Sequence, residues 1–148
     1  MELEIRQAEA ADAPRIALLE QQCFADPWSE ETIRHEIVDN PMAAFLVGAS
    51  HGQVQGYIGY WIIQKDLCIN NVAVAPETRR KQVGTRLMTT LLEQAEAAGL
   101  QGATLEVRVS NQPAIALYTG LGFQSAGIRP HYYQDNGEDA IIMWRTVG

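Results

Sequence analysis

The segment of residues 70–88, NNVAVAPETRRKQVGTRLM, changes from a strand pattern to a helix pattern across a short basic turn. The strand covers residues 67–76 and ends at Pro76, which cannot continue a ladder of backbone hydrogen bonds. The helix covers residues 83–98, where leucines recur on one face, and Gly99 supplies its C-terminal cap. A strand followed by a long helix predicts a crossover that returns the chain to a parallel strand.

Downstream of this unit, the chain repeats the order of strand and helix. Residues 103–109, ATLEVRV, alternate between apolar and polar side chains, and Pro113 stands where a helix can begin. A short helix follows over residues 114–121, and residues 123–128 and 138–144 have the pattern of two closing strands. This second unit of strand and helix predicts another parallel crossover.

Upstream of the opening segment, the pattern indicates one strand and two helices. Residues 3–7 alternate as a strand, and residues 11–23 have helical spacing. Ser29 stands before two glutamates as the N-cap of the second helix, which Asn40 and Pro41 end.

Two further apolar runs, residues 42–49 and 54–63, flank the loop SHGQ and predict an antiparallel hairpin. The complete order is β-α-α-β-β-β-α-β-α-β-β. Hairpins make antiparallel neighbours and the two later helices make parallel crossovers, so the sheet must be mixed. The sequence therefore predicts an α/β fold.

The composition is that of one soluble domain over residues 1–148, with 47% apolar and 20% charged residues. No apolar run reaches 18 residues, and the first residues lack the basic start and apolar stretch of a signal peptide. We therefore expect no membrane partner and a cytoplasmic location. Cys23 and Cys68 have no metal-ligand spacing, so neither a metal nor a disulfide framework is expected.

The net charge of −7 and the pI of about 4.9 bear on the choice of partner. An acidic protein repels nucleic-acid phosphate, so we expect no direct contact with nucleic acid. An acidic surface favours a basic partner, such as an amine or an arginine-rich peptide. Solubility alone is an alternative explanation of the charge.

The turn before the long helix reverses this charge locally. Arg79, Arg80, Lys81 and Arg86 place four positive charges within eight residues, next to the free N–H groups of a helix N-terminus. Such a turn can hold a pyrophosphate, although a solvated basic turn is an equal alternative. The phosphate-loop motif and the three-glycine dinucleotide motif are both absent from the sequence.

Two polar groups stand out in the unit of residues 105–123. Glu106 precedes Tyr118 by twelve positions, and the carboxylate could accept a proton that the phenol could return. Each also has a structural alternative. Glu106 alternates with apolar neighbours and could lie on the exposed face of its strand, while Tyr118 falls on an apolar stripe and could be a core aromatic residue.

Several motifs occur together in one order along the chain: DPWS near residue 26, NNVAV followed by RRK and VG, LEVR with SN, ALY with LGF, and YY followed by EDAIIM. In this combination the chain resembles the GNAT N-acetyltransferases. It is most similar to the subfamily that acetylates the N-terminal alanine of a ribosomal protein. The match runs from about Asp26 to Met143.

The resemblance implies a mixed, twisted sheet flanked by helices, in which the central parallel strands, residues 67–74 and 103–109, splay apart around acetyl-CoA. It also implies which residues hold this co-substrate: the backbone of Val72, Ala73 and Val74 beside the pantetheine arm, the turn of Arg80, Lys81, Gln82, Val83, Gly84 and Thr85 around the pyrophosphate, and Asn111. One position departs from the family pattern, because Gln82 replaces a glycine. Asn111 also stands where it could serve only as a helix cap.

The resemblance further implies a mechanism in which Glu106 is the base and Tyr118 the acid. An amine must lose a proton before it can attack a thioester, and the leaving thiolate can be protonated. The implied acceptor is the basic N-terminal peptide of a small-subunit ribosomal protein, with Tyr132 and Tyr133 beside it. Transfer to internal lysines or to a small amine is one alternative. A non-catalytic acyl-CoA sensor, which would need neither Glu106 nor Tyr118, is another.

Overall fold

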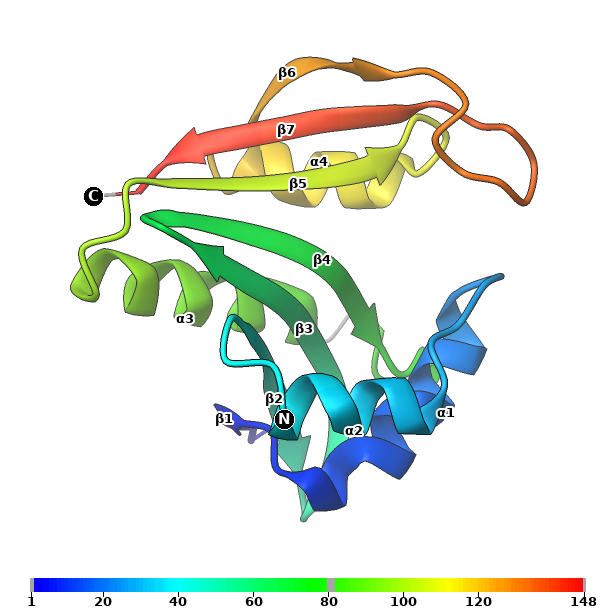
Figure 1. Cartoon of the computed structure of the whole chain (residues 1–148), viewed down its shortest axis with the longest axis vertical. Helices are drawn as coiled ribbons and strands as arrows, with labels where there is room; N and C mark the ends of the chain where they lie inside the picture. Colours follow the sequence, from blue (N-terminus) through cyan, green and yellow to red (C-terminus); the bar gives the residue numbers. More distant parts are fainter. Residues whose placement is uncertain (1, 80–81, 148) are drawn as a thin grey trace.

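A mixed sheet with two layers of helices forms the described part of the chain, which in this computed structural model comprises residues 2–79 and 82–147. The strand order is β1-β2-β3-β4-β5-β7-β6 (Figure 1). The strands are β1 (Glu4–Gln7), β2 (Ala43–Ser50), β3 (Gln53–Ile63), β4 (Asp66–Val74), β5 (Gly102–Arg108), β6 (Gln124–Arg129) and β7 (Ala140–Thr146). Only β4 and β5 pair in parallel among these strands, and the other neighbours are antiparallel.

The helices follow the predicted order. They are α1 (Ala13–Cys23), α2 (Glu30–Val38), α3 (Val83–Ala97) and α4 (Gln112–Gly120), with two short 3-10 turns, η1 (Ala10–Asp12) and η2 (Pro76–Thr78), that the sequence pattern did not indicate. The predicted cap is confirmed, because the Ser29 hydroxyl accepts a hydrogen bond from the backbone N–H of Thr32 at 3.1 Å. Gly99 follows α3 with a φ of 78°, as a C-terminal cap requires. The predicted α/β fold is therefore confirmed.

The two crossovers differ in what they join. The chain from β4 through α3 returns to β5, which pairs with β4 in parallel as predicted. The chain from β5 through α4 returns to β6, but β7 lies between β5 and β6 and is antiparallel to both. Strand β6 thus has the same direction as β5 without pairing with it, so this second parallel crossover skips one strand.

The hairpin of β2 and β3 is tighter than the predicted four-residue loop. Both strands extend to the turn, which consists of His51 and Gly52 with φ values of 53° and 77°. Positive φ at both central residues matches the right-handed twist of the flanking strands, and glycine accepts this conformation without strain.

The core has two parts, one on each face of the sheet. Leu46 and Ile58 pack with α3 and α4 on one face, whereas Val47 and Tyr57 pack with α1 and α2 on the other. Neighbouring residues of a strand therefore enter different cores, as the two-residue period of a strand requires. Burial on both faces explains why β2 and β3 have nearly continuous apolar sequences.

The parallel strands β4 and β5 pair only at one end. Their register covers three pairs, from Asp66 with Gly102 to Cys68 with Thr104, and beyond that point the strands diverge (Figure 1). The divergence coincides with an irregularity in β4, where Asn70 has no partner in β3. An extra residue of this kind bends its strand and increases the local twist. The expected splay of the two central strands is thus present.

Candidate active site

A cleft of about 770 Å³ opens where β4 and β5 separate. Its walls include β4, β5, the end of α1, the segment between α1 and α2, α4, and residues near the turn after β6. Glu106 and Tyr118 both line this cleft, and so do Val72 and Asn111. The fold therefore brings these four residues, which lie up to 46 positions apart in sequence, to one opening.

Glu106 lies in the middle of β5 opposite Ile142 of β7, with 27% of its side chain exposed. Its Oε1 atom lies 3.3 Å from Nε of Arg129. A hydrogen bond with Glu106, followed by burial, raises the pKa of Tyr132 to about 12. The carboxylate thus faces the cleft with two partners and is not a freely exposed strand residue.

Tyr118 is buried on α4, with 8% of its surface exposed. Its ring packs edge-on against Phe123, with 6.0 Å between the ring centroids. Burial, and to a smaller extent Tyr133, raises the pKa of Tyr118 to about 12. The phenol is therefore protonated at neutral pH, so it can donate that proton but cannot act as a base there. Tyr118 belongs to the core and also lines the cleft.

The end of β4 offers one backbone edge to the cleft. Val72, Ala73 and Val74 pair on one side with β3, and the register with β5 ends before them at Cys68. Ala73 itself is buried in the core beneath α1. An extended ligand could add to the other side as a strand, because main-chain groups in that position are free of β5.

The turn into α3 is described from Gln82 onward, and the predicted residues Arg80 and Lys81 lie outside the described residues. Gln82 is the N-cap of α3 and has left-handed backbone angles, with φ of 61° and ψ of 24°. Val83 is buried, whereas Gly84 and Thr85 are half-buried in the first helical turn. The glycine that the family pattern places at position 82 would fit this left-handed conformation.

Because of this conformation, we expect Gln82→Gly to stabilise the folded protein slightly. A left-handed conformation costs a non-glycine residue about 1 kcal/mol or more, partly offset by the greater freedom of glycine in the unfolded chain. Urea denaturation should show a gain of up to about 1 kcal/mol. Gln64→Gly is the matched control, since Gln64 has a similar φ of 56° in the turn between β3 and β4. A loss for Gln82→Gly alone would mean that the Gln82 side chain makes a stabilising contact.

Asn111 is the N-cap of α4. Its side-chain oxygen accepts a hydrogen bond from the backbone N–H of Ala114 at 3.2 Å, so Asn111 does cap the helix. Asn111 also lines the cleft, where its amide group leaves further hydrogen-bonding capacity. A contact with the co-substrate remains a prediction.

Sequence reasoning missed Glu20, which is only 2% exposed on α1 and also lines the cleft. Its carboxylate accepts hydrogen bonds from the Trp28 backbone N–H at 2.9 Å, the Asn71 side chain at 3.1 Å and the Tyr57 hydroxyl. Burial, followed by the charge of Glu20, raises the pKa of Tyr57. One signal was present in the sequence, because Glu20 follows Ile16 by four residues and so shares its apolar helix face.

Tyr132 and Tyr133 stand at the cleft on the segment between β6 and β7. Their rings are perpendicular with centroids 5.1 Å apart. Tyr132 forms a hydrogen bond with Glu106 and is 48% exposed. Its ring can therefore contact a molecule that approaches the Glu106 carboxylate.

In the described residues, no helix is long and apolar enough to cross a membrane. Over the same residues, no group of three or more His, Cys, Asp or Glu side chains is arranged to hold a metal ion.

Comparison with known proteins identifies the family. Residues 13–123 match the acetyltransferase (GNAT) family. A Bacillus subtilis protein, provisionally named a ribosomal protein bS18-alanine N-acetyltransferase, is 40% identical over 143 residues, covering 97% of this chain and 95% of the relative. The N-alpha-acetyltransferase RimI of Mycobacterium tuberculosis is 34% identical over 93% of this chain and 89% of its own.

The fold agrees with a solved structure. The crystal structure of the ribosomal-protein-S18-alanine N-acetyltransferase from Escherichia coli superimposes with a TM-score of 0.91 and 33% identity, covering 99% of this chain and 95% of that one. Members of the GNAT family use acetyl-CoA as the acetyl donor. The chain therefore belongs to the GNAT family of acetyltransferases.

Proposed function

We propose that this protein transfers the acetyl group of acetyl-CoA to the α-amine of the N-terminal alanine of ribosomal protein bS18. The observation that carries the proposal is one cleft that holds a half-buried carboxylate, Glu106, and a buried phenol, Tyr118, at the divergence of two parallel strands. The bS18-alanine acetyltransferases among its relatives support the choice of acceptor. The net charge of −7 suits a basic peptide, chiefly by speeding its encounter with the protein.

In the proposed reaction, Glu106 accepts a proton from the acceptor ammonium group, directly or through a water molecule. The neutral amine then attacks the thioester carbonyl, so that a C–N bond forms and the C–S bond breaks. Tyr118 gives its proton to the leaving thiolate, and the proton released by the new amide nitrogen restores the phenol. Glu106 then releases to solvent the proton that it accepted. With a pKa raised to about 12, Tyr118 carries its proton at neutral pH and has it available to donate.

The fit of acetyl-CoA to these residues rests on two features. The backbone edge at Val72, Ala73 and Val74 could pair with the amides of the pantetheine arm. The N–H groups at the start of α3, from Gln82 to Thr85, are suited to the pyrophosphate, with Arg80, Lys81 and Asn111 as further candidates.

We expect Gly84→Ala to weaken acetyl-CoA binding roughly tenfold, or about 1.4 kcal/mol. The protein itself has room for the methyl group, because a Cβ at Gly84 would lie 3.7 Å from Val74 and 3.8 Å from Leu117. Stability should be equal or higher, since alanine is the better helix former. The methyl group would instead obstruct the close approach of a pyrophosphate to the backbone.

Titration calorimetry with acetyl-CoA measures this effect. Gly120→Ala is a matched control, because Gly120 ends α4 and a Cβ there would meet open space. An unchanged affinity in Gly84→Ala would mean that acetyl-CoA does not bind at the first turn of α3.

The acceptor is tested with two peptides. An α-amine has a pKa about 2 to 3 units below that of a lysine, which makes deprotonation easier by roughly 3–4 kcal/mol. A peptide that begins Ala-Arg should therefore be acetylated at its α-amine. The same peptide with a blocked α-amine and one internal lysine should react far more slowly. Mass spectrometry locates the acetyl group, and an equal rate on the lysine peptide would replace this proposal with lysine acetylation.

A further inference from the structure

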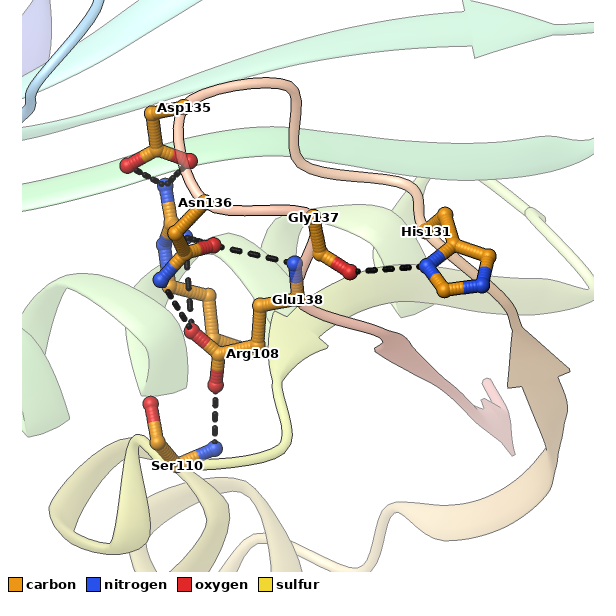
Figure 2. A network of polar contacts seen from close by, with 7 residues as sticks. All are labelled: Arg108, Ser110, His131, Asp135, Asn136, Gly137 and Glu138. Carbon is orange, nitrogen blue, oxygen red and sulfur yellow. Dashed lines mark hydrogen bonds and ion pairs between the residues drawn. The ribbon is translucent and has the colours of Figure 1, made fainter.

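Arg108 binds the segment between β6 and β7 to β5, the strand that carries Glu106. The two residues are two positions apart on β5, so their side chains leave the same face of the strand, and both line the cleft. Figure 2 shows the Arg108 side chain beside Asp135, Asn136 and Glu138, with Ser110 on the other side of Glu138.

The contacts of Arg108 use its planar, forked shape. Its Nη2 atom lies 3.1 Å from both carboxylate oxygens of Asp135, and its Nη1 atom donates to Asn136 at 3.3 Å and to Glu138 at 3.4 Å. The guanidinium carbon also lies 4.0 Å from the ring centroid of Tyr133. A lysine has a single charged atom and cannot make these contacts together.

The same segment forms backbone hydrogen bonds within itself, and it has a second attachment to the rest of the protein through Ser110. The backbone N–H of Tyr133 donates to the carbonyl of Glu138, and that of Gly137 donates to the carbonyl of Tyr133. Glu138 accepts a hydrogen bond from the Ser110 backbone N–H at 2.7 Å, and its bonds with Ser110 lower the pKa of Glu138 to about 2. Glu138 therefore stays ionised at neutral pH as a partner for Arg108.

We propose that Arg108 is a positioning residue for the acceptor. It holds residues 130–139 at the cleft so that Tyr132 stays beside Glu106 and Tyr133 stays at the wall. This inference rests on the proposed function, because it assigns these two rings to the acceptor side of the reaction. It predicts that the affinity for the acceptor peptide depends on Arg108, whereas the affinity for acetyl-CoA does not.

The contacts of Arg108 with Asp135, Asn136 and Glu138 form a clamp on this segment, and two of its three charged side chains are about one third exposed. The Arg108 side chain is 29% exposed and that of Asp135 is 34% exposed, and ion pairs of this kind contribute little to global stability. Loss of the clamp should therefore loosen one segment and leave the remaining fold intact.

The test compares Arg108→Gln and Arg108→Lys with wild type. We expect the KM for the Ala-Arg peptide to rise roughly ten- to a hundredfold in Arg108→Gln, with a smaller rise in Arg108→Lys. The acetyl-CoA dissociation constant should stay within about twofold. Hydrogen exchange should accelerate in the amides of residues 131–139 and nowhere else. The control is Arg34→Gln, which removes the surface ion pair with Glu30 and should change none of these quantities.

A double variant tests whether Arg108 and Asp135 act through their contact with each other. Because Asp135→Asn removes the negative charge and one of the two acceptor oxygens beside Nη2 of Arg108, it should raise the peptide KM by itself. Adding it to Arg108→Gln should raise the KM little further, since both changes break one interaction. Additive effects would mean that the two residues act separately and would overturn the clamp.

Two further results would overturn the proposal. One is an unchanged peptide KM in Arg108→Gln, and the other is a parallel loss of acetyl-CoA affinity, which would indicate general damage. Failure of the proposed function is recognised separately, because wild-type protein would then leave the Ala-Arg peptide unmodified. If wild type acetylates only the lysine peptide, the same KM comparison on that peptide decides the role of Arg108. If neither peptide reacts, unchanged exchange in residues 131–139 overturns the clamp, and accelerated exchange there with unchanged acetyl-CoA affinity supports it.

Discussion

Glu106→Gln should lower kcat for peptide acetylation by roughly 10²–10⁴, the usual contribution of a general base. The amide has nearly the same shape as the carboxylate and can still accept the hydrogen bond from Tyr132. It cannot accept a proton at neutral pH. The fold and the acetyl-CoA affinity should therefore be preserved while the chemical step is slowed.

The pH dependence of kcat distinguishes the loss of a general base in Glu106→Gln from a change in the structure of the site. A free α-amine has an ordinary pKa near 7.7–8.0, so at higher pH the acceptor is already neutral. The deficit of Glu106→Gln should therefore shrink as the pH rises from 7 to 9. Arg129→Gln is the control for the ion pair, because it removes the partner at 3.3 Å and leaves the carboxylate in place. An equal kcat in wild type and Glu106→Gln would exclude Glu106 from proton transfer.

Glu20→Ala should destabilise the folded protein by roughly 3–5 kcal/mol. The substitution leaves three donors without their acceptor: the Trp28 backbone N–H, the Asn71 amide and the Tyr57 hydroxyl. These donors come from β3, β4 and the segment after α1, so the carboxylate joins three parts of the cleft wall. Thermal unfolding should show a midpoint lower by roughly 10 °C or more for a chain of this length.

The size of this effect depends on burial. Glu30→Ala provides the comparison, since Glu30 makes an exposed ion pair with Arg34 and its removal should change stability by less than about 0.5 kcal/mol. A loss below about 1 kcal/mol in Glu20→Ala would mean that desolvation of the carboxylate cancels its hydrogen bonds in the folded state.

Local sequence determined the elements of this fold because their signals lie within single helices and strands. The leucines of α3 recur at helical spacing and are buried, with Leu87 at 0% and Leu91 at 2% exposure. Ser29 caps α2 and Gly99 follows α3, as their side-chain chemistry predicts. The sequence motifs also identified the family, which the comparisons confirmed.

Tertiary structure decided what joins distant parts of the chain. The place of β7 between β5 and β6 is not encoded in any one strand, because the residues of a single strand do not specify its neighbours in the sheet. The unpaired Asn70, where β4 leaves β5, depends on the register of β3. Sequence periodicity describes which face a residue occupies but not which strand lies next to it.

Sequence and tertiary structure also determine different features of the cleft. The sequence singled out Glu106 and Tyr118 by residue type and spacing, and both line one opening. It could not show that Arg129 and Tyr132 contact Glu106, or that Glu20 is buried against Tyr57 and Asn71. These contacts join residues 23 to 51 positions apart, and they form only after the helices and loops have packed around the sheet. Such pairing leaves no periodic pattern in the sequence, so only the folded structure specifies it.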